Sequence, residues 1–458
     1  MSSSATGGRT FLDMNAYQWT VLFAAWLGWG FDVFDGLLFN YVAPNCVPTL
    51  LGLELGSAEA KSATLFWTGA LTSLLLVGWA IGGIVFGAVA DKIGRTKTLL
   101  LTMALYSLGT ALCALAPNLY VLAFCRLIAS LGIGGEWAAG ASMVAEVVPE
   151  KRRVEAGALL YTSAPVGLFL ATYVTWTIQG QWFAGSPEVA WRYVFLCGLI
   201  PAAVALVVRM FVKEPERWQA VAESVRLSEI FAPEYVKRTL SGLGLALTAL
   251  LMWWSCNAFI PVVANGLAAT AAEAQGLTGA AATMMKESWK ATATNAFNLG
   301  GFLGTLFTVP VSKVLGRRAM FGLYFVGSAA AILATFGLPM DPYTRLYMYF
   351  PIGLTVFGVF GSFTYYLPEL YPTRLRATGA GFCYNAGRVI AALGPFLVGA
   401  IASQGSDTAG IRAFLGGSAA ATPLDAAMNV LFWVGAVPLI GMLLLPFVRE
   451  TRDQVLAD

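Results

Sequence analysis

Long runs of apolar residues recur along this chain from Tyr17 to Val448, and they restrict its possible folds more than any other feature. A helix that crosses a membrane needs about 20 predominantly apolar residues to span a hydrocarbon layer about 30 Å thick. Strands of a membrane β-barrel would instead alternate in polarity over about 10 residues, so the runs favour helices. The sequence therefore predicts an all-α membrane protein with twelve transmembrane helices. They are expected near residues 17–42, 63–90, 98–116, 119–146, 154–178, 191–212, 239–265, 290–312, 319–338, 344–367, 377–402 and 426–447.

Charge supports this class and predicts an orientation. Only 12% of the residues are charged, whereas soluble domains carry about 25%. Lys and Arg gather in alternate loops, such as residues 92–97 and 151–153, and basic residues favour the cytoplasmic side. We therefore expect a bacterial inner-membrane protein with both termini in the cytoplasm, whose surroundings are lipid and not nucleic acid. The chain has no histidine and no Cys-x-x-Cys pair, so neither a metal site of N and S ligands nor another cofactor is expected.

The chain also repeats itself. Glu146 and Arg153, in AEVVPEKRR, recur 223 residues later as Glu369 and Arg376, in PELYPTRLR. Parallel repeats of six helices, related by an axis along the membrane normal, are typical of transporters that rock around a central site. We expect two pseudo-symmetric six-helix bundles. The predicted division is a tail at 1–16, an N-terminal bundle at 17–212, a cytoplasmic linker at 213–238, a C-terminal bundle at 239–448 and a tail at 449–458.

Several of these motifs resemble a known family. GAVADKIGRTK at 87–97 resembles the loop 2–3 signature of the major facilitator superfamily, and AEVVPEKRR and PELYPTRLRATG resemble its sugar-porter-like branch. AWLGWGFDVFD at 25–35 and SLGIGGEWAAG at 130–140 are most similar to the sialate:proton symporter family. Members of that family carry sialic acids or lactate and pyruvate. The resemblance implies transport by alternating access.

The resemblance also implies a charge latch at the cytoplasmic end, centred on Asp91 and Arg95. The alternative is a solvated turn that only enforces topology. In the second half Lys313 stands where Asp91 stands in the first, so the latch is not expected to be symmetric. The glutamate and arginine repeats are expected to be structural and not to bind substrate. The proposed latch residues are Gly87, Asp91, Gly94, Arg95, Glu146, Arg153, Glu369 and Arg376.

Five ionisable residues lie deep in the predicted helices: Asp32, Asp35, Arg126, Glu136 and Arg388. Each costs about 2.5–3.5 kcal/mol or more at the bilayer centre and should face the bundle interior. Asp32 and Asp35 are one helical turn apart, so we expect both to line the cavity between the bundles. Two such charges resist joint ionisation, which suits proton carriers; alternatively, either one caps a local helix break. Arg126 is expected to pair with an acid of the first helix, and Glu136 is either a second proton site or a structural partner.

Arg388 has no carboxylate at comparable depth in the second half, so we expect it to hold the carboxylate of a substrate. The rival interpretation pairs it across the cavity with Asp32, Asp35 or Glu136. The other candidate substrate contacts are Tyr384, Asn385, Asn295, Asn298, Asn257, Tyr365 and Trp254.

These observations predict a monomeric, proton-coupled importer of a small organic anion, such as a lactate-like acid or a sialic acid. A proton-coupled sugar or aromatic-acid transporter is an alternative. A drug:proton antiporter is less favoured, because the fifth helix, YTSAPVGLFLAT, lacks the GPxxGG pattern. A non-transporting nutrient sensor on the same fold is a further alternative, but such a sensor usually needs a long cytoplasmic extension, and the predicted tails are short. No nucleophile and base are arranged as in an enzyme.

Overall fold

The computed structural model describes residues 14–149, 152–209, 226–372, 375–404 and 422–452. Within these ranges the side chains of residues 88, 90–91, 95–96, 135–143, 145–146, 153–154, 202, 205–206, 208–209 and 377 are not described. Five predicted site residues therefore lie outside the described side chains. They are Asp91, Arg95, Glu136, Glu146 and Arg153.

The first half of the chain folds into long helices joined by short turns. Asn15 caps the first helix, and its side chain and that of Gln18 satisfy each other's backbone amides. Gly52, with φ of 69°, ends the same helix. The helices are α1 (Ala16–Leu51), α2 (Ala58–Ile93), α3 (Arg95–Cys113), α4 (Leu119–Val147), α5 (Arg153–Tyr161), α6 (Ser163–Thr175), the π-helix η3 (Trp176–Trp182), α7 (Pro187–Leu196), the 3-10 turn η4 (Cys197–Leu199) and α8 (Ile200–Arg209).

The second half is more often interrupted. Pro261 and Pro438 begin new helices where a continuous one was expected, because proline fits only the first turn. A 3-10 turn, η6 (Leu227–Phe231), precedes this half. Its helices are α9 (Val236–Asn257), α10 (Ile260–Ala274), α11 (Gly279–Leu315), α12 (Arg317–Gly337), α13 (Pro342–Tyr347), α14 (Tyr349–Ile352), the π-helix η7 (Gly353–Phe357), α15 (Phe360–Glu369), α16 (Arg376–Ala391), α17 (Leu393–Ser403), α19 (Pro423–Val434), α20 (Val437–Met442) and the 3-10 turn η9 (Leu445–Phe447).

The described helices fit the expected membrane passages. Eight stretches are long and apolar enough to cross a membrane, and Lys97–Cys113 and Leu119–Gly134 are shorter apolar helices. The remaining two passages correspond to α11, which begins in a polar segment, and to α7 with α8, which η4 separates. Large apolar side chains such as Ile84 (71% exposed) and Phe124 (62% exposed) cover the flanks, as a lipid-facing surface requires. The all-helical fold predicted from the sequence is confirmed.

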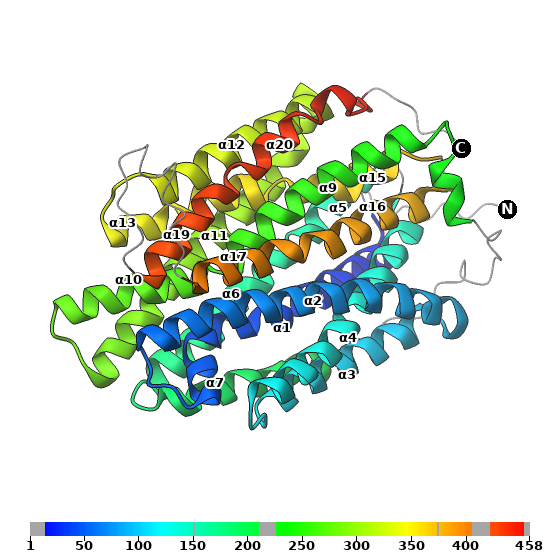
Figure 1. The fold of residues 1–458 in the computed structure, drawn as a ribbon. Helices are drawn as coiled ribbons and strands as arrows, with labels where there is room; N and C mark the ends of the chain where they lie inside the picture. Colours follow the sequence, from blue (N-terminus) through cyan, green and yellow to red (C-terminus); the bar gives the residue numbers. More distant parts are fainter. Residues whose placement is uncertain (1–13, 150–151, 210–225, 373–374, 405–421, 453–458) are drawn as a thin grey trace.

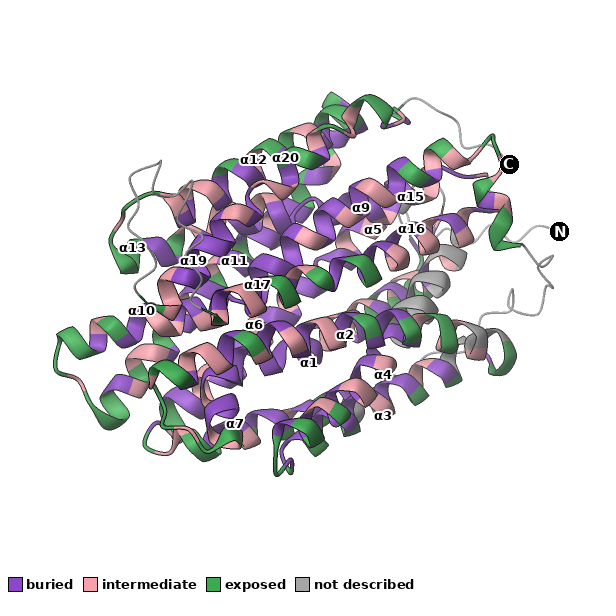
Figure 2. Ribbon diagram, viewed as in Figure 1, coloured by how far each residue is buried: buried purple, intermediate pink, exposed green. Residues whose placement is uncertain are grey.

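The two halves lie side by side with their helices roughly parallel, and buried residues concentrate where they meet (Figure 1, Figure 2). At the seam, α2 packs against α17, where a Cβ on Gly69 would lie 2.3 Å from the carbonyl oxygen of Pro395. We call the end of the bundle where α1 begins and Arg452 lies the terminal end. There Lys313, at the end of α11, meets Glu155 of α5.

Two helices extend further than their apolar runs predicted. α1 continues to Leu51 and α11 begins at Gly279, because a helix can persist beyond the apolar stretch that marks its membrane passage. This extension matters for the site, since it places Glu287 and Lys290 within a buried part of α11 and not at the start of a helix.

Candidate substrate site

A small cavity of about 30 Å³ lies between the two halves, with room for one or two water molecules. Its walls are mostly aromatic, and its one charged residue among the described lining is an arginine. A larger ligand needs the halves to move apart. The first half contributes Trp29, Val33, Gly36, Leu37, Trp79, Tyr161 and Ala164, and the second half contributes Trp253, Trp254, Phe357, Phe360, Tyr384 and Arg388.

Arg388, on α16, is the charged group of this cavity and is only 3% exposed. Its guanidinium lies 4.3 Å from the ring centre of Trp79, in the other half, and 4.9 Å from that of Tyr384. Its Nη1 donates a hydrogen bond of 3.1 Å to Oδ1 of Asn385. Its Nε has no acceptor in the described part of the chain. The rings and the amide therefore orient a buried cation that retains donor capacity.

Two indole groups of the lining also retain donors. Trp79 is 4% exposed and Trp253 is 6% exposed, and Nε1 of each lacks an acceptor among the described residues. Buried polar groups normally have hydrogen-bond partners. With Nε of Arg388, three donors belong to residues around a cavity whose described lining contains no carboxylate and no amide. This arrangement suits a ligand that brings acceptors and negative charge.

Tyr161 and Tyr384 place the cavity relative to the repeat. They are 223 residues apart, which is the offset of the sequence repeat, and their hydroxyl oxygens lie 3.5 Å from each other. Equivalent residues of two repeats related by a two-fold axis meet only close to that axis. The contact therefore puts the cavity where both halves contribute and where their relative motion changes its shape.

The two aspartates of α1 do not line this cavity. The face of α1 that lines it carries Trp29, Val33 and Gly36, so the expectation that both carboxylates line the cavity is wrong for the described structure. A helix turns about 100° per residue, so the side chains of Asp32 and Asp35 point in other directions than those of the lining residues. Asp32 and Asp35 are nevertheless fully buried.

Asp35 belongs to a cluster inside the first half. Its Oδ2 accepts a 2.7 Å hydrogen bond from the hydroxyl of Thr110. Arg126 donates from Nη1 to the carbonyl oxygen of Asp35, at 3.1 Å, and from Nη2 to that of Gly36. Arg126 thus meets an acidic residue of the first helix, as expected, but it contacts the backbone. Its charge still acts on the Asp35 carboxylate through space.

Asp32 influences a residue of the second half of the protein. The negative charge of its carboxylate is within electrostatic range of Arg388, across the seam between the halves. The rival interpretation made from the sequence, in which Arg388 pairs across the cavity with Asp32, Asp35 or Glu136, stays a prediction. An anionic ligand of the cavity would meet this influence of Asp32 as well as the positive charge of Arg388.

The other predicted substrate contacts divide into three groups. Tyr384 and Trp254 line the cavity, and Asn385 orients Arg388. Asn257 and Asn298 are buried but do not line it. Two further predicted contacts, Asn295 and Tyr365, do not line it either. Asn295 is exposed, and the hydroxyl of Tyr365 bonds to the carbonyl oxygen of Thr308 near the terminal end.

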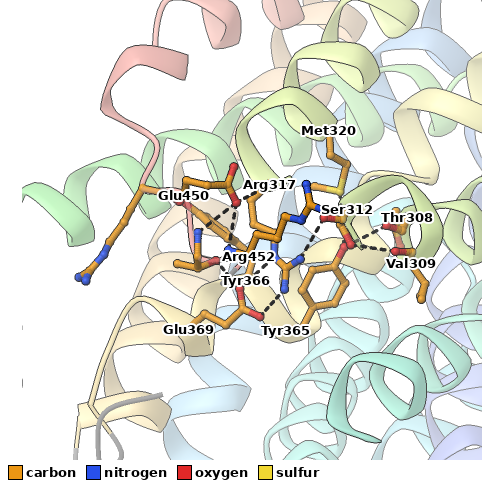
Figure 3. A network of polar contacts seen from close by, with 12 residues as sticks. Thr308, Val309, Ser312, Arg317, Met320, Tyr365, Tyr366, Glu369, Glu450 and Arg452 are labelled. Carbon is orange, nitrogen blue, oxygen red and sulfur yellow. Dashed lines mark hydrogen bonds and ion pairs between the residues drawn. The ribbon is translucent and has the colours of Figure 1, made fainter. Parts of the chain in front are cut away.

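At the terminal end, Glu369 pairs with a residue that the motif did not indicate. Arg317 donates from Nη2 to Oε1 of Glu369 at 2.8 Å and from Nε to Oε2 at 3.2 Å, and its guanidinium lies over the ring of Tyr365 (Figure 3). Glu450 accepts backbone amides of Arg317 and Arg318 beside them. All these groups belong to the second half, so this cluster braces one half and does not by itself join the two.

Among the described residues, Lys313 and Glu155 form an ion pair of 2.7 Å that crosses between the halves at this end. Lys313 is the residue that replaces Asp91 in the second half. The asymmetric latch itself stays a prediction. Gly94 and Gly316, before α3 and α12, have φ of 100° and 86°, as the repeated Gly-Arg motif requires. The role of Gly87, whose missing Cβ would meet no atom within 4 Å, stays a prediction.

A buried polar seam was missed by the sequence analysis. Nζ of Lys290 lies 2.6 Å from Oε1 of Glu287, both side chains are 2% exposed, and Nζ also donates to the carbonyl oxygen of Tyr41 in α1. Asn45 donates to Glu287 and to Gln179 of η3. The signal for this seam was an i, i+3 pair of opposite charges, which lay outside the apolar run assigned to the helix.

The fold and the cavity define a class: a polytopic membrane protein of two similar helical halves that enclose a small aromatic cavity with one buried arginine, as in secondary transporters. Residues 19–395 match the Major Facilitator Superfamily, and the chain belongs to that family of membrane transporters. It is not an enzyme.

The chain is similar to three transporters over most of their lengths. The chain is 29% identical to a probable 4-methylmuconolactone transporter of Cupriavidus pinatubonensis, over 82% of each chain. It is 27% identical to the sialic acid transporter NanX of Escherichia coli, over 82% of this chain and 85% of the relative. It is 26% identical to the gentisate transporter of Corynebacterium glutamicum, over 86% and 83%. A D-xylose-proton symporter has the same fold, with a TM-score of 0.69 at 17% identity, over 96% of this chain and all of that one.

Proposed function

We propose that this transporter imports a small, flat monocarboxylate together with a proton, in a bacterial inner membrane and with both termini in the cytoplasm. The observation that carries the proposal is Arg388, a buried guanidinium in an aromatic cavity whose neighbours keep donors without acceptors. A planar guanidinium binds a carboxylate through two parallel hydrogen bonds, and aromatic walls favour a flat ligand body.

The lining separates this class from sugars and sialic acids. A polyhydroxylated ligand needs many hydrogen-bond partners of both kinds, because unpaired polar groups in a buried site are costly. The described lining contains no Asn, Gln, Asp or Glu. Gentisate, the cargo named for one relative, is an aromatic acid and is the more suitable first probe.

We infer coupling to protons from the electrostatic influence of Asp32 on Arg388. When Asp32 is ionised, it competes with a substrate carboxylate for the positive charge of Arg388. When Asp32 holds a proton, that competition ends and Arg388 can bind the anion. Proton and substrate then promote each other's binding, and such coupling is reciprocal. Release of the proton on the cytoplasmic side would restore the Asp32–Arg388 attraction and expel the anion.

The test is calorimetry of gentisate binding to purified protein at several pH values. Losing one charge-assisted hydrogen bond costs about 1.5–3 kcal/mol, so Arg388→Lys should bind at least about tenfold more weakly and Arg388→Ala should lose binding. Asp32→Asn should bind without the pH dependence of the wild type. Asp35→Asn is the matched control, since Asp35 bonds to Thr110 and not toward the cavity. If Arg388→Ala bound gentisate as tightly as the wild type does, and bound the amide of gentisate equally well, the role of Arg388 as the carboxylate anchor would be refuted.

A further inference from the structure

A second cavity, of about 300 Å³, lies at the end of the bundle opposite the terminal end. Its size is at the lower limit of ordinary ligand pockets. We call it the outer vestibule and define it by six of its polar lining residues. They are Asn45, Lys61, Thr64, Asn265, Thr270 and Lys286.

Two ammonium groups face this space from opposite halves of the protein. Lys61 lies on α2 and Lys286 on α11, and both are half-buried. Lys61 is the strongest charge acting on Lys286, and it is repulsive. Glu273 and Glu287 offset it in part, but neither lines the vestibule. Two like charges around one cavity leave a positive potential in it, because low-dielectric walls focus the field.

Neither lysine has a hydrogen bond or ion pair of its side chain with another described residue, and the described lining of the vestibule contains no carboxylate. The remaining polar groups are amides and hydroxyls, which can donate to an anion. An anion between the lysines would therefore remove a repulsion and gain two charge-assisted contacts.

The vestibule also borders the buried seam. Asn45 lines it and donates to Glu287, whose partner Lys290 holds α11 against Tyr41 of α1. A ligand in the vestibule is thus separated from the centre of the protein by the contacts that close this end. That position is suitable for a first binding step.

We propose that the outer vestibule is a second binding site, in which Lys61 and Lys286 hold a small carboxylate before it reaches Arg388. This proposal rests on the function proposed above, because it assumes that the transported molecule is an anion. The same chemistry would accept the phosphate of a lipid headgroup, and the test separates the two.

The test measures chemical labelling in place of transport. Thr270 lines the vestibule and is exposed, so Thr270→Cys provides a reporter thiol. The protein without this substitution is the control, because it shows how much labelling comes from the natural cysteines. The protein is placed in nanodiscs of neutral phosphatidylcholine and treated with an anionic or a cationic methanethiosulfonate. The ratio of the anionic to the cationic rate should fall about tenfold or more when Lys61→Gln and Lys286→Gln are added, because both positive charges then leave the vestibule.

Gentisate should slow the labelling by the anionic reagent in the protein with both lysines and not in the double glutamine variant. The protection should persist in Arg388→Ala, which lacks the central anchor. This arm distinguishes the two proposals, because failure of the central site leaves it unchanged. An unaltered rate ratio without the lysines would overturn the vestibule site. If anionic phosphatidylglycerol nanodiscs slowed the labelling and gentisate did not, the vestibule would be a lipid site, and the proposal would also be overturned.

Discussion

The buried pair of Glu287 and Lys290 provides the sharpest test of how the outer end closes. Lys290 neutralises Glu287 at 2.6 Å and also bonds to the backbone of Tyr41 in the other half. Both side chains are 2% exposed, so in this structure water does not solvate either charge. Replacing Lys290 with Met removes the cation and the contact to α1 while roughly keeping the volume. It leaves the Glu287 carboxylate buried without its partner.

The magnitude follows from that burial. Removing one member of a buried ion pair costs about 3–5 kcal/mol, because the other charge stays desolvated. If opening of the outer end hydrates Glu287, this cost falls on the closed state alone. The ratio of open to closed protein should then rise by about two to three and a half orders of magnitude. The double variant Glu287→Gln with Lys290→Met carries no charge at these two positions, so its ratio should return most of the way to that of the wild type.

Distances between spin labels at Glu54→Cys and Gln275→Cys measure the opening, since these exposed residues lie at the outer end in different halves. Lys290→Met should lengthen the dominant distance, and the double variant should restore it. Lys286→Met is the matched control, because Lys286 is on the same helix but its half-buried side chain lines the outer vestibule. A distance distribution in Lys290→Met that matches the wild type, or a double variant as open as the single one, would refute the reasoning.

Three further predictions concern the terminal end. Arg317→Ala should lower the thermal stability of the protein more than Thr451→Val does, because it leaves the part-buried Glu369 without its bidentate partner; equal melting temperatures would contradict this. Lys313→Glu should speed labelling of a cysteine introduced at the terminal end, and Lys313→Glu with Glu155→Lys should reverse the effect. Lys313→Ala should change little, because a half-exposed pair contributes about 0–1 kcal/mol. Burial alone would raise the pKa of Glu450, but four backbone amides outweigh it and lower that pKa below its usual 4.5. The segment around Glu450 should therefore resist hydrogen exchange fully above about pH 4.5 and lose that protection as the pH falls through the lowered pKa, and equal protection in Glu450→Gln at pH 7 would refute it.

The sequence could show the class of the protein, because a membrane imposes simple rules on composition. Apolar runs must be long enough to cross it, and buried charges must be few and face inward. Arg388 was recognisable on these grounds alone, as a cation at depth with no acid near it in its own half. The repeat was also visible, since the motifs around Glu146 and Glu369 keep a constant offset.

The partners of these charges were decided by the tertiary structure. Whether Asp32 or Trp29 lines the cavity depends on the rotation of α1, which its uniformly apolar sequence does not specify. Glu287 and Lys290 looked like the polar start of a helix, and only packing against α1 and η3 makes them a buried pair. Sequence records which residues a membrane excludes or admits, but contacts between helices depend on how they are rotated and placed against one another. For that reason the sequence by itself determined the helical membrane fold and the buried cation, and only the folded chain decided what that cation faces.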